Sequence, residues 1–249
     1  MEIPKIIFQT WKTYDVPDNW KYGQKTVKEK NKDWKYVLLS DEDNLRIVKQ
    51  HFPDFLPYYV NFKYNIQRAD AIRYMVLYLY GGVYLDLDYQ ALKPFDKIIL
   101  ENGKEVGLMK SSNIDCITNS FLCSHKGAKF WLECIEEMKK PYKWWYLTKH
   151  FKIYYSTGPF MVDMVYKANK DKAQILEITV PCNICNIDNC EYNKKYFLRA
   201  IYGQSWNSWD TFTINFIYCN KKSIIYVILI IILTIIIIYR IMRNYTDRK

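Results

Sequence analysis

The sequence predicts an α/β fold with a doubly wound nucleotide-binding half, followed by one C-terminal transmembrane helix. Three observations lead to this prediction. Apolar runs of strand length alternate with helical segments through the first 88 residues, a D-x-D motif ends the third run, and an uncharged apolar stretch lies near the C-terminus. With 249 residues, half of them hydrophobic, the chain is long enough for one large α/β domain or two small ones.

The first two strands and helices follow from apolar runs and their boundaries. Ile3 to Thr10 is a short apolar run suited to a buried strand, Trp20 to Lys30 is expected to be helical, and Trp34 to Leu39 is a second strand-like run. Ser40 and Asp43 have the spacing of a capping box, so a further helix is expected to begin there.

A long, largely apolar helix is expected within residues 64–82. Gly81 and Gly82 end it, because glycine readily takes the left-handed conformation found after helices. The third strand carries the sequence VYLDLD, in which Asp86 and Asp88 share one face because alternate strand residues point the same way. The resulting order β-α-β-α-α-β is typical of a doubly wound nucleotide-binding half, whose ligands lie at the carboxyl ends of the strands.

The charged residues around this strand indicate a cation-dependent site. Asp86 and Asp88 repel each other at a buried strand end, which favours a bound cation, whereas at a solvated strand end they need none. Asp70 and Arg73 project from one face of the preceding helix, and Arg68 points elsewhere. An acceptor and a fork-shaped donor beside two carboxylates suit sugar hydroxyls and phosphates, and a plain ion pair is the alternative.

The net charge of the chain and the distribution of its lysines limit the expected binding partners. The formal charge of +10 can attract phosphates, nucleic acid or an anionic membrane surface. The lysines are scattered along the chain instead of forming a stripe, which argues against nucleic acid.

The seven cysteines fall into different contexts. Three lie singly in apolar or mixed surroundings typical of reduced, buried thiols, and suggest a reducing compartment: Cys116, Cys123 and Cys134. Three others combine C-x-x-C spacing with a third thiol: Cys182, Cys185 and Cys190. No fourth ligand is near them in the sequence, so a structural zinc site, free thiols and a loop disulfide all remain open.

The C-terminal apolar stretch runs from Ser223 to Tyr239 without a charge. At about 1.5 Å per residue it reaches about 25 Å, the short end of a bilayer span. The expected organisation is therefore a domain over residues 1–215, a linker over 216–222, a transmembrane helix over 223–240 and a short basic tail over 241–249.

The N-terminal residues MEIPKIIFQTWK carry an acidic residue and a proline where a signal peptide needs a basic and then a long apolar region. We therefore expect a single-pass C-terminal membrane anchor whose large domain faces the cytosol. The basic residues beside the apolar stretch point weakly the other way: Lys221 and Lys222 precede it, and Arg240, Arg243, Arg248 and Lys249 follow it.

Three segments carry a resemblance to a known family: IPKIIFQTWK, RADAIRYMVLYLYGGVYLDLD and STGPFM. They resemble the DXD-containing glycosyltransferase family 32, which includes yeast initiating mannosyltransferases and inositolphosphoceramide mannosyltransferases and is distantly similar to the glucosylating clostridial toxins. The resemblance covers about residues 2–210 and implies a GT-A fold, a Rossmann-like mixed sheet flanked by helices. The Ile-, Lys- and Asn-rich composition is similar to that of proteins from AT-rich genomes, such as those of large DNA viruses.

The resemblance also implies roles for individual residues. The nucleotide is expected to contact Gln9, Thr10 and Trp11. The donor sugar is expected to contact Asp70, Arg73 and Asn119. Asp86 would lie nearest the ribose and sugar and Asp88 would bind Mn²⁺ or Mg²⁺ directly, with Asp86 as the second residue of the metal site. The implied catalytic set is Asp86, Asp88 and Arg73.

Two later segments are implied to complete the site. The segment YGQSWNSWD resembles a loop that closes over the phosphates, with Ser205 and either Trp206 or Trp209 as the closing residues. The acceptor side would be shaped by Thr157, Gly158 and Pro159.

One departure from the family concerns the metal. Relatives usually carry one or two histidines just before this loop, where this chain has Ala200 and Ile201. The metal would then rest on Asp88, the diphosphate and water, with Asn207 or Ser208 as substitutes. The alternative is a catalytically weak or inactive membrane-tethered module that binds a nucleotide-sugar or a partner.

The expected reaction is metal-dependent transfer of mannose or another hexose from GDP-mannose or a UDP-sugar to a glycan, lipid or protein, with retention of configuration. Breaking the sugar–diphosphate bond leaves negative charge on the diphosphate, which a divalent ion and Arg73 are suited to stabilise. A phosphohydrolase of the haloacid dehalogenase type also ends an apolar strand in D-x-D, but Thr or Val usually follows there, where this chain has Tyr89 and Gln90.

Overall fold

The computed structural model describes residues 2–111, 114–141, 148–180, 185, 195–201, 203 and 205–246. The chain divides into two compact units, Met1–Trp206 and Asn207–Lys249.

A mixed sheet of six strands forms the centre of the first unit, in the order β2-β1-β3-β6-β5-β7. Its strands are β1 (Ile6–Thr10), β2 (Lys35–Leu39), β3 (Gly82–Leu85), β5 (Val106–Lys110), β6 (Ile117–Ser124) and β7 (Ala173–Leu176). β1 is parallel to β2 and β3, β6 is antiparallel to β3 and β5, and β7 is parallel to β5. A separate antiparallel pair joins β4 (Tyr89–Ala91) to β8 (Leu198–Ala200). The sheet is therefore mixed, as the family resemblance implies.

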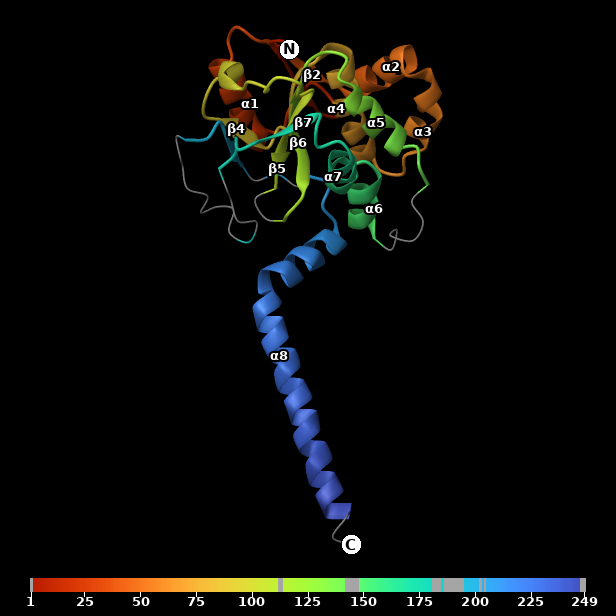
Figure 1. Cartoon of the computed structure of the whole chain (residues 1–249), viewed down its shortest axis with the longest axis vertical. Coiled ribbons are helices and arrows are strands. Elements are labelled where there is room, and N and C mark those ends of the chain that lie inside the picture. The colour runs from red at the N-terminus through yellow and green to blue at the C-terminus, as the bar shows by residue number, and fades with distance from the viewer. Residues whose placement is uncertain are drawn as a thin grey trace. The chain divides into compact units, whose positions relative to one another are not determined.

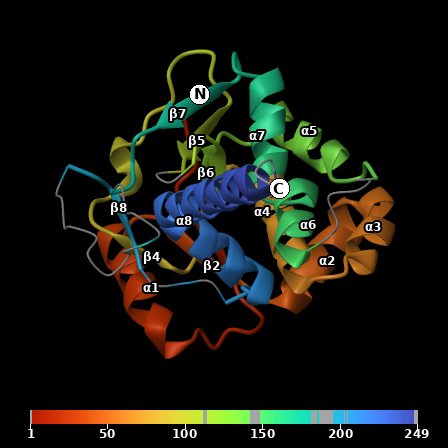
Figure 2. The same cartoon turned by 90° about the horizontal axis from the view of Figure 1, so that it is seen from below.

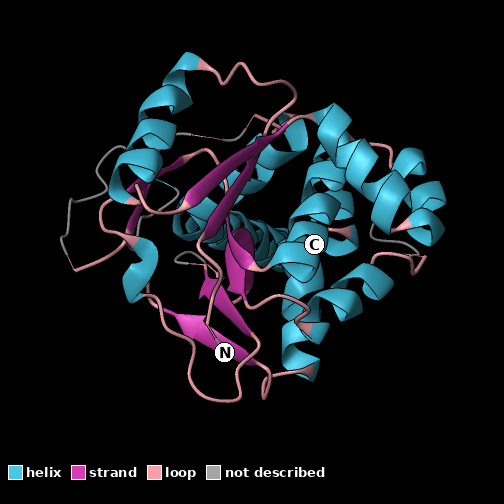
Figure 3. Ribbon diagram, turned by 90° about the horizontal axis from the view of Figure 1, so that it is seen from above, coloured by secondary structure: helices cyan, strands magenta, loops and turns pink. Residues whose placement is uncertain are grey.

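Helices cover both faces of the sheet (Figure 1). Seven helices belong to the described part of the first unit: α1 (Asp18–Lys30), α2 (Asp41–His51), α3 (Leu56–Asn61), α4 (Asn65–Tyr80), α5 (Lys129–Glu137), α6 (Lys149–Ser156) and α7 (Pro159–Ala168). Short 3₁₀ turns occupy Pro53–Phe55 and Phe95–Lys97. Seen from below, α1 lies on one side of the sheet and α2 to α7 lie on the other (Figure 2). The view from above shows helices on both sides of the strands (Figure 3).

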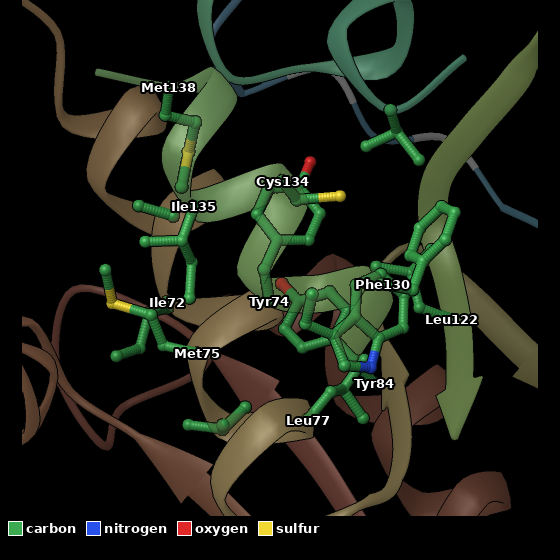
Figure 4. Close-up of a cluster of buried hydrophobic side chains, with 14 of the residues drawn as sticks. Ile72, Tyr74, Met75, Leu77, Tyr84, Leu122, Phe130, Cys134, Ile135 and Met138 are labelled. Carbon is green, nitrogen blue, oxygen red and sulfur yellow. The ribbon is translucent and has the colours of Figure 1, made fainter. Parts of the chain in front are cut away.

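Each face of the sheet buries its own hydrophobic core. On the α4 side, Tyr84 and Leu122 of the sheet pack with α4, α5 and α7 (Figure 4). On the α1 side, Val83, Leu85 and Phe121 pack with α1 and the turn at Phe95–Lys97. Because α4 contributes a continuous buried run from Asp70 to Leu77, it is fixed along most of its length.

Local signals in the sequence account for the ends of two helices. At the start of α2, the Asp43 N–H donates to Ser40 Oγ and the Ser40 N–H donates to Asp43 Oδ2, which confirms the capping box. At the end of α4, Gly81 and Gly82 take φ values of 67° and 97°, which a side chain disfavours. A Cβ at Gly82 would also overlap the carbonyl of Ile6 in β1, so glycine is needed where the chain turns from α4 into β3.

The second unit is a single long helix, α8 (Trp209–Thr246). It is long and apolar enough to cross a bilayer, and its apolar residues between 225 and 239 are exposed. Residues 216–222, which the sequence suggests as a linker, are helical and belong to α8.

The described cysteines are of two kinds. Cys116, Cys123 and Cys134 are free and buried, as predicted. Cys185 and Cys219 are each disulfide-bonded, which agrees with the disulfide left open for Cys185 and differs from the reducing compartment that the three buried thiols suggest. A bonded Cys185 has no thiolate to offer zinc, and Cys182 and Cys190 lie outside the described residues.

Candidate active site

An open cavity of about 460 Å³ lies at the carboxyl ends of β1 and β3, where ligands of doubly wound sheets bind. Thr10 is the last residue of β1, and Asp86 directly follows β3. Seven of the site residues predicted from the sequence line this cavity: Thr10, Trp11, Arg73, Asp86, Asp88, Ser205 and Trp206.

The D-x-D motif follows the third strand and does not lie in it. β3 ends at Leu85, and a turn contains Leu87 and Asp88. The argument from strand alternation is therefore wrong for this motif, although both of its carboxylate residues line the cavity. Leu87 between them is buried in a cluster with Val16 and Trp20, as expected of an inward-facing leucine.

Arg73 connects α4 to the motif. Its Nη1 lies 3.2 Å from Asp86 Oδ1, and its Nη2 lies 3.0 Å from Asp70 Oδ1, which confirms that Asp70 and Arg73 share a helix face. The same Nη1 donates to the carbonyl of Asn119 at 2.7 Å, and the guanidinium lies 4.6 Å from the centroid of the Tyr84 ring. Because its side chain is 3% exposed and held on several sides, Arg73 presents a fixed positive charge at the cavity wall.

Asp70 lies behind the cavity wall. Besides its ion pair with Arg73, it accepts hydrogen bonds from Asn119 Nδ2 at 2.8 Å and from Thr157 Oγ1 at 2.9 Å. Asp70, Asn119 and Thr157 are all buried, and none of them lines the cavity. The two residues after Thr157 lead into α7 and do not line it either. In this structure these residues position Arg73, which differs from the direct donor and acceptor contacts that the resemblance implies.

Gln9 also differs from its implied role as a nucleotide contact. It is completely buried, its Nε2 donates to the carbonyl of Asp86 at 3.2 Å, and its Oε1 accepts from the Tyr36 hydroxyl at 2.7 Å. With both ends of its amide engaged, Gln9 fixes the backbone at the start of the D-x-D motif.

Asp88 carries the least satisfied polar atom of the site. Its Oδ1 is buried and has no hydrogen-bond partner in the described part of the chain. Gly203 lies so close to the same carboxylate that a Cβ there would overlap Oδ2. The carbonyl of Asp88 accepts from the N–H of Ile201 at 2.8 Å, so the chain that leads into the Ser205–Trp206 turn is held against the motif.

Burial raises the pKa of both carboxyl groups of the motif. For Asp88 the pKa rises to about 7, with the negative charge of Asp86 as the second cause. For Asp86 burial raises the pKa, and the charge of Arg73 and the hydrogen bond from Tyr84 oppose the rise. A positive charge beside Asp88 would therefore stabilise the ionised form of the pair.

The residues present fit a hard divalent cation such as Mn²⁺ or Mg²⁺. Carboxylate oxygens are preferred ligands of these ions, and the unpartnered Asp88 oxygen offers one. Among the described residues, no group of three or more His, Cys, Asp or Glu side chains gathers to hold a metal. Ile201, one of the two positions where the family resemblance implies a histidine, packs with Trp20 and Leu87. Water and the donor diphosphate would therefore have to supply most of the coordination.

Of the two candidate closing tryptophans, Trp206 lines the cavity. Its ring stacks on His150 with centroids 5.5 Å apart, and its carbonyl accepts from Lys149 Nζ. Trp209 begins α8 in the second unit and is 74% exposed. Ser208, one of the suggested substitute ligands, donates its hydroxyl to Asp210 Oδ1.

Several residues of the cavity wall were not predicted from the sequence. Tyr84 donates its hydroxyl to Asp86 Oδ1 at 2.9 Å, and its position two residues before Asp86 is a signal that could have identified it. Trp20 packs edge-on against Trp11 with ring centroids 4.9 Å apart. Lys12 and Ala69 lie next to Trp11 and Asp70 within the family motifs. The other lining residues had no sequence signal: Asp41, Lys63, Tyr64, Asn65, Ile66 and Lys149.

Comparisons with known proteins agree with this geometry. Residues 17–104 match the family model described as a glycosyltransferase sugar-binding region containing a DXD motif. The chain is 37% identical over 168 residues to the mannosyl phosphorylinositol ceramide synthase SUR1 of Saccharomyces cerevisiae, which covers 68% of this chain and 43% of the relative. It is 34% identical over 166 residues to inositol phosphoceramide mannosyltransferase 3 of Schizosaccharomyces pombe, and the match covers 67% of this chain and 45% of the relative. The chain thus spans about half the length of these curated relatives.

A viral protein and solved structures are also similar to this chain. An uncharacterised glycosyltransferase, L373, of Acanthamoeba polyphaga mimivirus is 37% identical over 95 residues, covering 34% of this chain and 36% of the relative. The PaToxG glycosyltransferase superposes with a TM-score of 0.54 at 18% identity, covering 68% of this chain and 70% of that one. The UDP-bound glycosyltransferase domain of the YGT toxin superposes with a TM-score of 0.51 at 9% identity, covering 70% of this chain and 79% of that one. At these identities the two structures show the shared GT-A fold.

Proposed function

Because this chain belongs to the family of glycosyltransferases whose sugar-binding region contains a DXD motif, we propose that it transfers a hexose, in the first instance mannose, from a nucleotide-sugar to an acceptor. One observation carries the proposal: the Arg73–Asp86 ion pair and Asp88, whose Oδ1 has no partner among the described residues, line one cavity at the strand ends. The mannosyltransferase names of the relatives support mannose as the sugar.

The nucleotide-sugar would lie between the end of β1 and the D-x-D turn. Trp11 offers a flat ring for the base, and Trp20, packed edge-on against it, limits its movement. The UDP bound to the toxin domain of the same fold supports a nucleoside diphosphate as the carrier. Trp206 lines the cavity and would cover the donor once it is bound.

The charges of the cavity suit cleavage of a sugar–diphosphate bond. Asp88, with Asp86 beside it, would hold Mn²⁺ or Mg²⁺, and the bound ion would offset the negative charge that develops on the leaving diphosphate. Arg73 adds a second positive charge whose direction is fixed by its contacts with Asp70 and Asp86. Because this arrangement exists before the donor binds, little reorganisation is needed in the transition state.

The family resemblance implies retention of configuration, and for a retaining reaction the carboxylates of the cavity favour same-face attack over a covalent glycosyl-enzyme intermediate. Among the described lining residues they are Asp41, Asp86 and Asp88. Arg73 and Tyr84 engage Asp86, and Asp88 is assigned to the metal, so neither is free to attack the anomeric carbon. Asp41 begins α2 and is not part of the D-x-D motif, so we do not assign it to the reacting centre. We therefore propose that the acceptor hydroxyl attacks from the face that the diphosphate leaves.

The acceptor is a glycan, lipid or protein, and the inositol phosphoceramide mannosyltransferases among the relatives favour a lipid. A lipid acceptor also suits the apolar helix α8, which we propose anchors the chain in a membrane. The anchor would keep the first unit at the surface where such an acceptor resides.

A radiolabelled donor screen tests the proposal. The purified full-length chain is incubated with GDP-mannose and with UDP-sugars, with Mn²⁺ or with EDTA. We expect metal-dependent transfer or slow hydrolysis of one donor, lost in Asp88→Asn. The substitution of histidine by Ala200 and Ile201 favours the alternative of an inactive binding module, which would bind the donor and metal without turning it over. A chain that neither binds nor cleaves any of these donors would contradict both.

A further inference from the structure

A lysine on the wall of the proposed active site contacts the backbone of the tryptophan that would cover the donor. Lys149, the first residue of α6, lines the cavity, and its ammonium donates a hydrogen bond to the carbonyl of Trp206, which lines the cavity too. The same ammonium lies 5.6 Å from the centroid of the Tyr64 ring. Lys149 is half-buried and held from two sides, so its charge has a defined place in the cavity.

The ring of Trp206 is held by the next residue of the same helix. It stacks on the buried His150 ring with centroids 5.5 Å apart, and the Tyr154 ring, one turn further along α6, lies 5.9 Å from it. The first turn of α6 therefore contacts both the backbone and the ring of Trp206. A change in this turn would alter where Trp206 lies in the cavity.

The chain that leads to Trp206 is also fixed at the D-x-D motif. The N–H of Ile201 donates to the carbonyl of Asp88 at 2.8 Å, and Gly203 lies against the Asp88 carboxylate. Gly203 and Trp206 are three residues apart, so at most about 11 Å of chain separates the contact with Asp88 from the contact with Lys149. The ammonium of Lys149 therefore belongs to the end of the cavity where Asp88 would hold the metal.

The cations of the cavity differ in whether a carboxylate already compensates their charge. Arg73 lies 3.0 Å from Asp70 and 3.2 Å from Asp86, so its charge is shared between two carboxylates. Lys149 forms no ion pair with the described residues, and the carbonyl that it contacts is neutral. An ammonium has three N–H donors, so Lys149 can still donate to a ligand while it holds Trp206.

We propose that Lys149 binds a phosphate of the donor and that the same side chain holds Trp206 closed over that phosphate. The inference rests on the proposed function, because it needs a nucleoside diphosphate in the cavity. With one N–H on the Trp206 carbonyl and another on a phosphate oxygen, the ammonium joins the bound donor to the backbone of the closing residue. Its uncompensated charge also opposes the negative charge that develops on the diphosphate when the sugar leaves.

Calorimetric titration tests the phosphate contact without requiring turnover. The full-length chain in detergent is titrated with GDP and with UDP, each in the presence of Mg²⁺. Lys149→Met keeps the length of the side chain but removes its charge and its donors. We expect it to weaken binding of the diphosphate that the wild type binds about tenfold, the scale of one lost charge-assisted hydrogen bond. Lys149→Arg should restore most of the affinity, because it keeps the charge and can donate to two acceptors.

Lys63 supplies the matched control. It lines the same cavity, and its ammonium lies 5.4 Å from the centroid of the same Tyr64 ring, but no contact joins it to Trp206 in the described part of the chain. Lys63→Met therefore removes an equal charge from the cavity, and we expect a smaller loss of diphosphate affinity. Equal weakening by Lys63→Met and Lys149→Met would mean that the lysines attract the anion in a general way, and would overturn the proposal.

The position of Trp206 needs a measurement of its own. In protein labelled with fluorotryptophan, the fluorine NMR signal of Trp206 is assigned by its loss in Trp206→Phe. Saturating diphosphate should shift this signal in the wild type, in Lys149→Arg and in Lys63→Met, and should leave it unshifted in Lys149→Met. The same shift in Lys149→Met would show that Trp206 responds to the donor without Lys149, and would overturn the link.

Asp88→Asn separates this inference from the proposed function. If a diphosphate binds the wild type with Mg²⁺, Asp88→Asn loses it and Lys149→Met binds it as tightly as the wild type, the proposed function stands and the role of Lys149 fails alone. If neither diphosphate binds the wild type, the proposed function fails, and the role of Lys149 fails with it.

Discussion

Arg73 and Asp86 form a partly buried ion pair, with Nη1 of the arginine 3.2 Å from Oδ1 of the aspartate, at the wall of the proposed active site. The same arginine neutralises Asp70 on its own helix. Arg73→Ala would leave the buried Asp70 and the partly buried Asp86 without a counter-charge, and we expect it to lower the free energy of unfolding by about 3–5 kcal/mol. Urea denaturation monitored by circular dichroism measures this loss.

The role of Arg73 in donor binding needs a gentler change. Arg73→Lys keeps the charge and removes the fork that reaches Asp70, Asp86 and the Asn119 carbonyl together. In a variant that still folds, we expect the substitution to lower the affinity for the nucleotide-sugar more than the affinity for the bare nucleoside diphosphate, as measured by calorimetry. Equal losses for the two ligands would show that Arg73 is purely structural.

Asp88→Asn tests the metal site. The change removes a charge from a carboxylate whose Oδ1 has no partner among the described residues, so stability in EDTA should be unchanged or slightly higher. With metal and nucleoside diphosphate at about 100 times their Kd, the free energy of unfolding of the wild type should rise by about 2.7 kcal/mol, and that of the variant should hardly change. Thermal unfolding with and without ligands measures both. The same ligand-induced gain in both proteins would place the metal elsewhere.

Gly203 should be as important to the site as the carboxylate it touches. Gly203→Ala would place a methyl group on Asp88 Oδ2, so the carboxylate or the backbone must move, at a cost of about 1–3 kcal/mol. We expect the ligand-induced stabilisation to fall as it does in Asp88→Asn. Combining the two substitutions should lower it no further, because both act on one group. A full additional loss in the double variant would mean that Gly203 acts independently of Asp88.

Local patterns in the sequence were sufficient to predict some of these relationships. The i,i+3 spacing of Asp70 and Arg73 and the capping spacing of Ser40 and Asp43 each fix a contact within one helix. The element order and the D-x-D motif likewise placed the site at the strand ends.

Other relationships depend on tertiary packing. Gln9 was expected to face a nucleotide, but burial turns it toward the carbonyl of Asp86, and nothing in its neighbourhood in the sequence shows this. Thr157 was expected at the acceptor and instead donates to Asp70 across the core. Lys63 and Lys149 meet at the cavity only because α4 and α6 lie together in the fold.

Asp43 gives a pH dependence that lies outside the site. Burial acts to raise its pKa, but hydrogen bonds from Tyr14 and Ser40 and the charge of Arg46 outweigh it, so the pKa lies below its usual value of 3.8. The ionised form is therefore favoured in the folded state, and its contribution to stability is present above the unfolded pKa and lost as the pH falls through the folded one. Asp43→Asn should lower the free energy of unfolding by about 1 kcal/mol at neutral pH, which is the effect of losing a helix cap.

Measurement of unfolding free energy at several pH values checks this sign. The difference between wild type and Asp43→Asn should shrink as the pH falls below 3.8. A difference that stays constant into the acid range would mean that the Asp43 carboxylate does not stabilise α2 through its charge.

The membrane orientation can be decided by protease protection. The cytosolic placement expected from the N-terminal residues conflicts with Cys185 and Cys219, which are each disulfide-bonded, because disulfides persist in oxidising compartments. The basic residues point the same way, since Arg240 and Arg243 follow the apolar stretch and only Lys221 and Lys222 precede it, and basic residues favour the cytosolic side. We therefore expect the first unit to lie on the lumenal side of the membrane.

Protease added to intact microsomes should leave the first unit whole and remove an epitope placed after residue 249, and detergent should then expose the first unit to digestion. Blocking free thiols before and after reduction should reveal additional reactive cysteines only after reduction, which checks the disulfides independently. Digestion of the first unit in intact microsomes, with Cys185 and Cys219 reactive before reduction, would restore the cytosolic orientation. The sugar would then be transferred on the cytosolic face of the membrane.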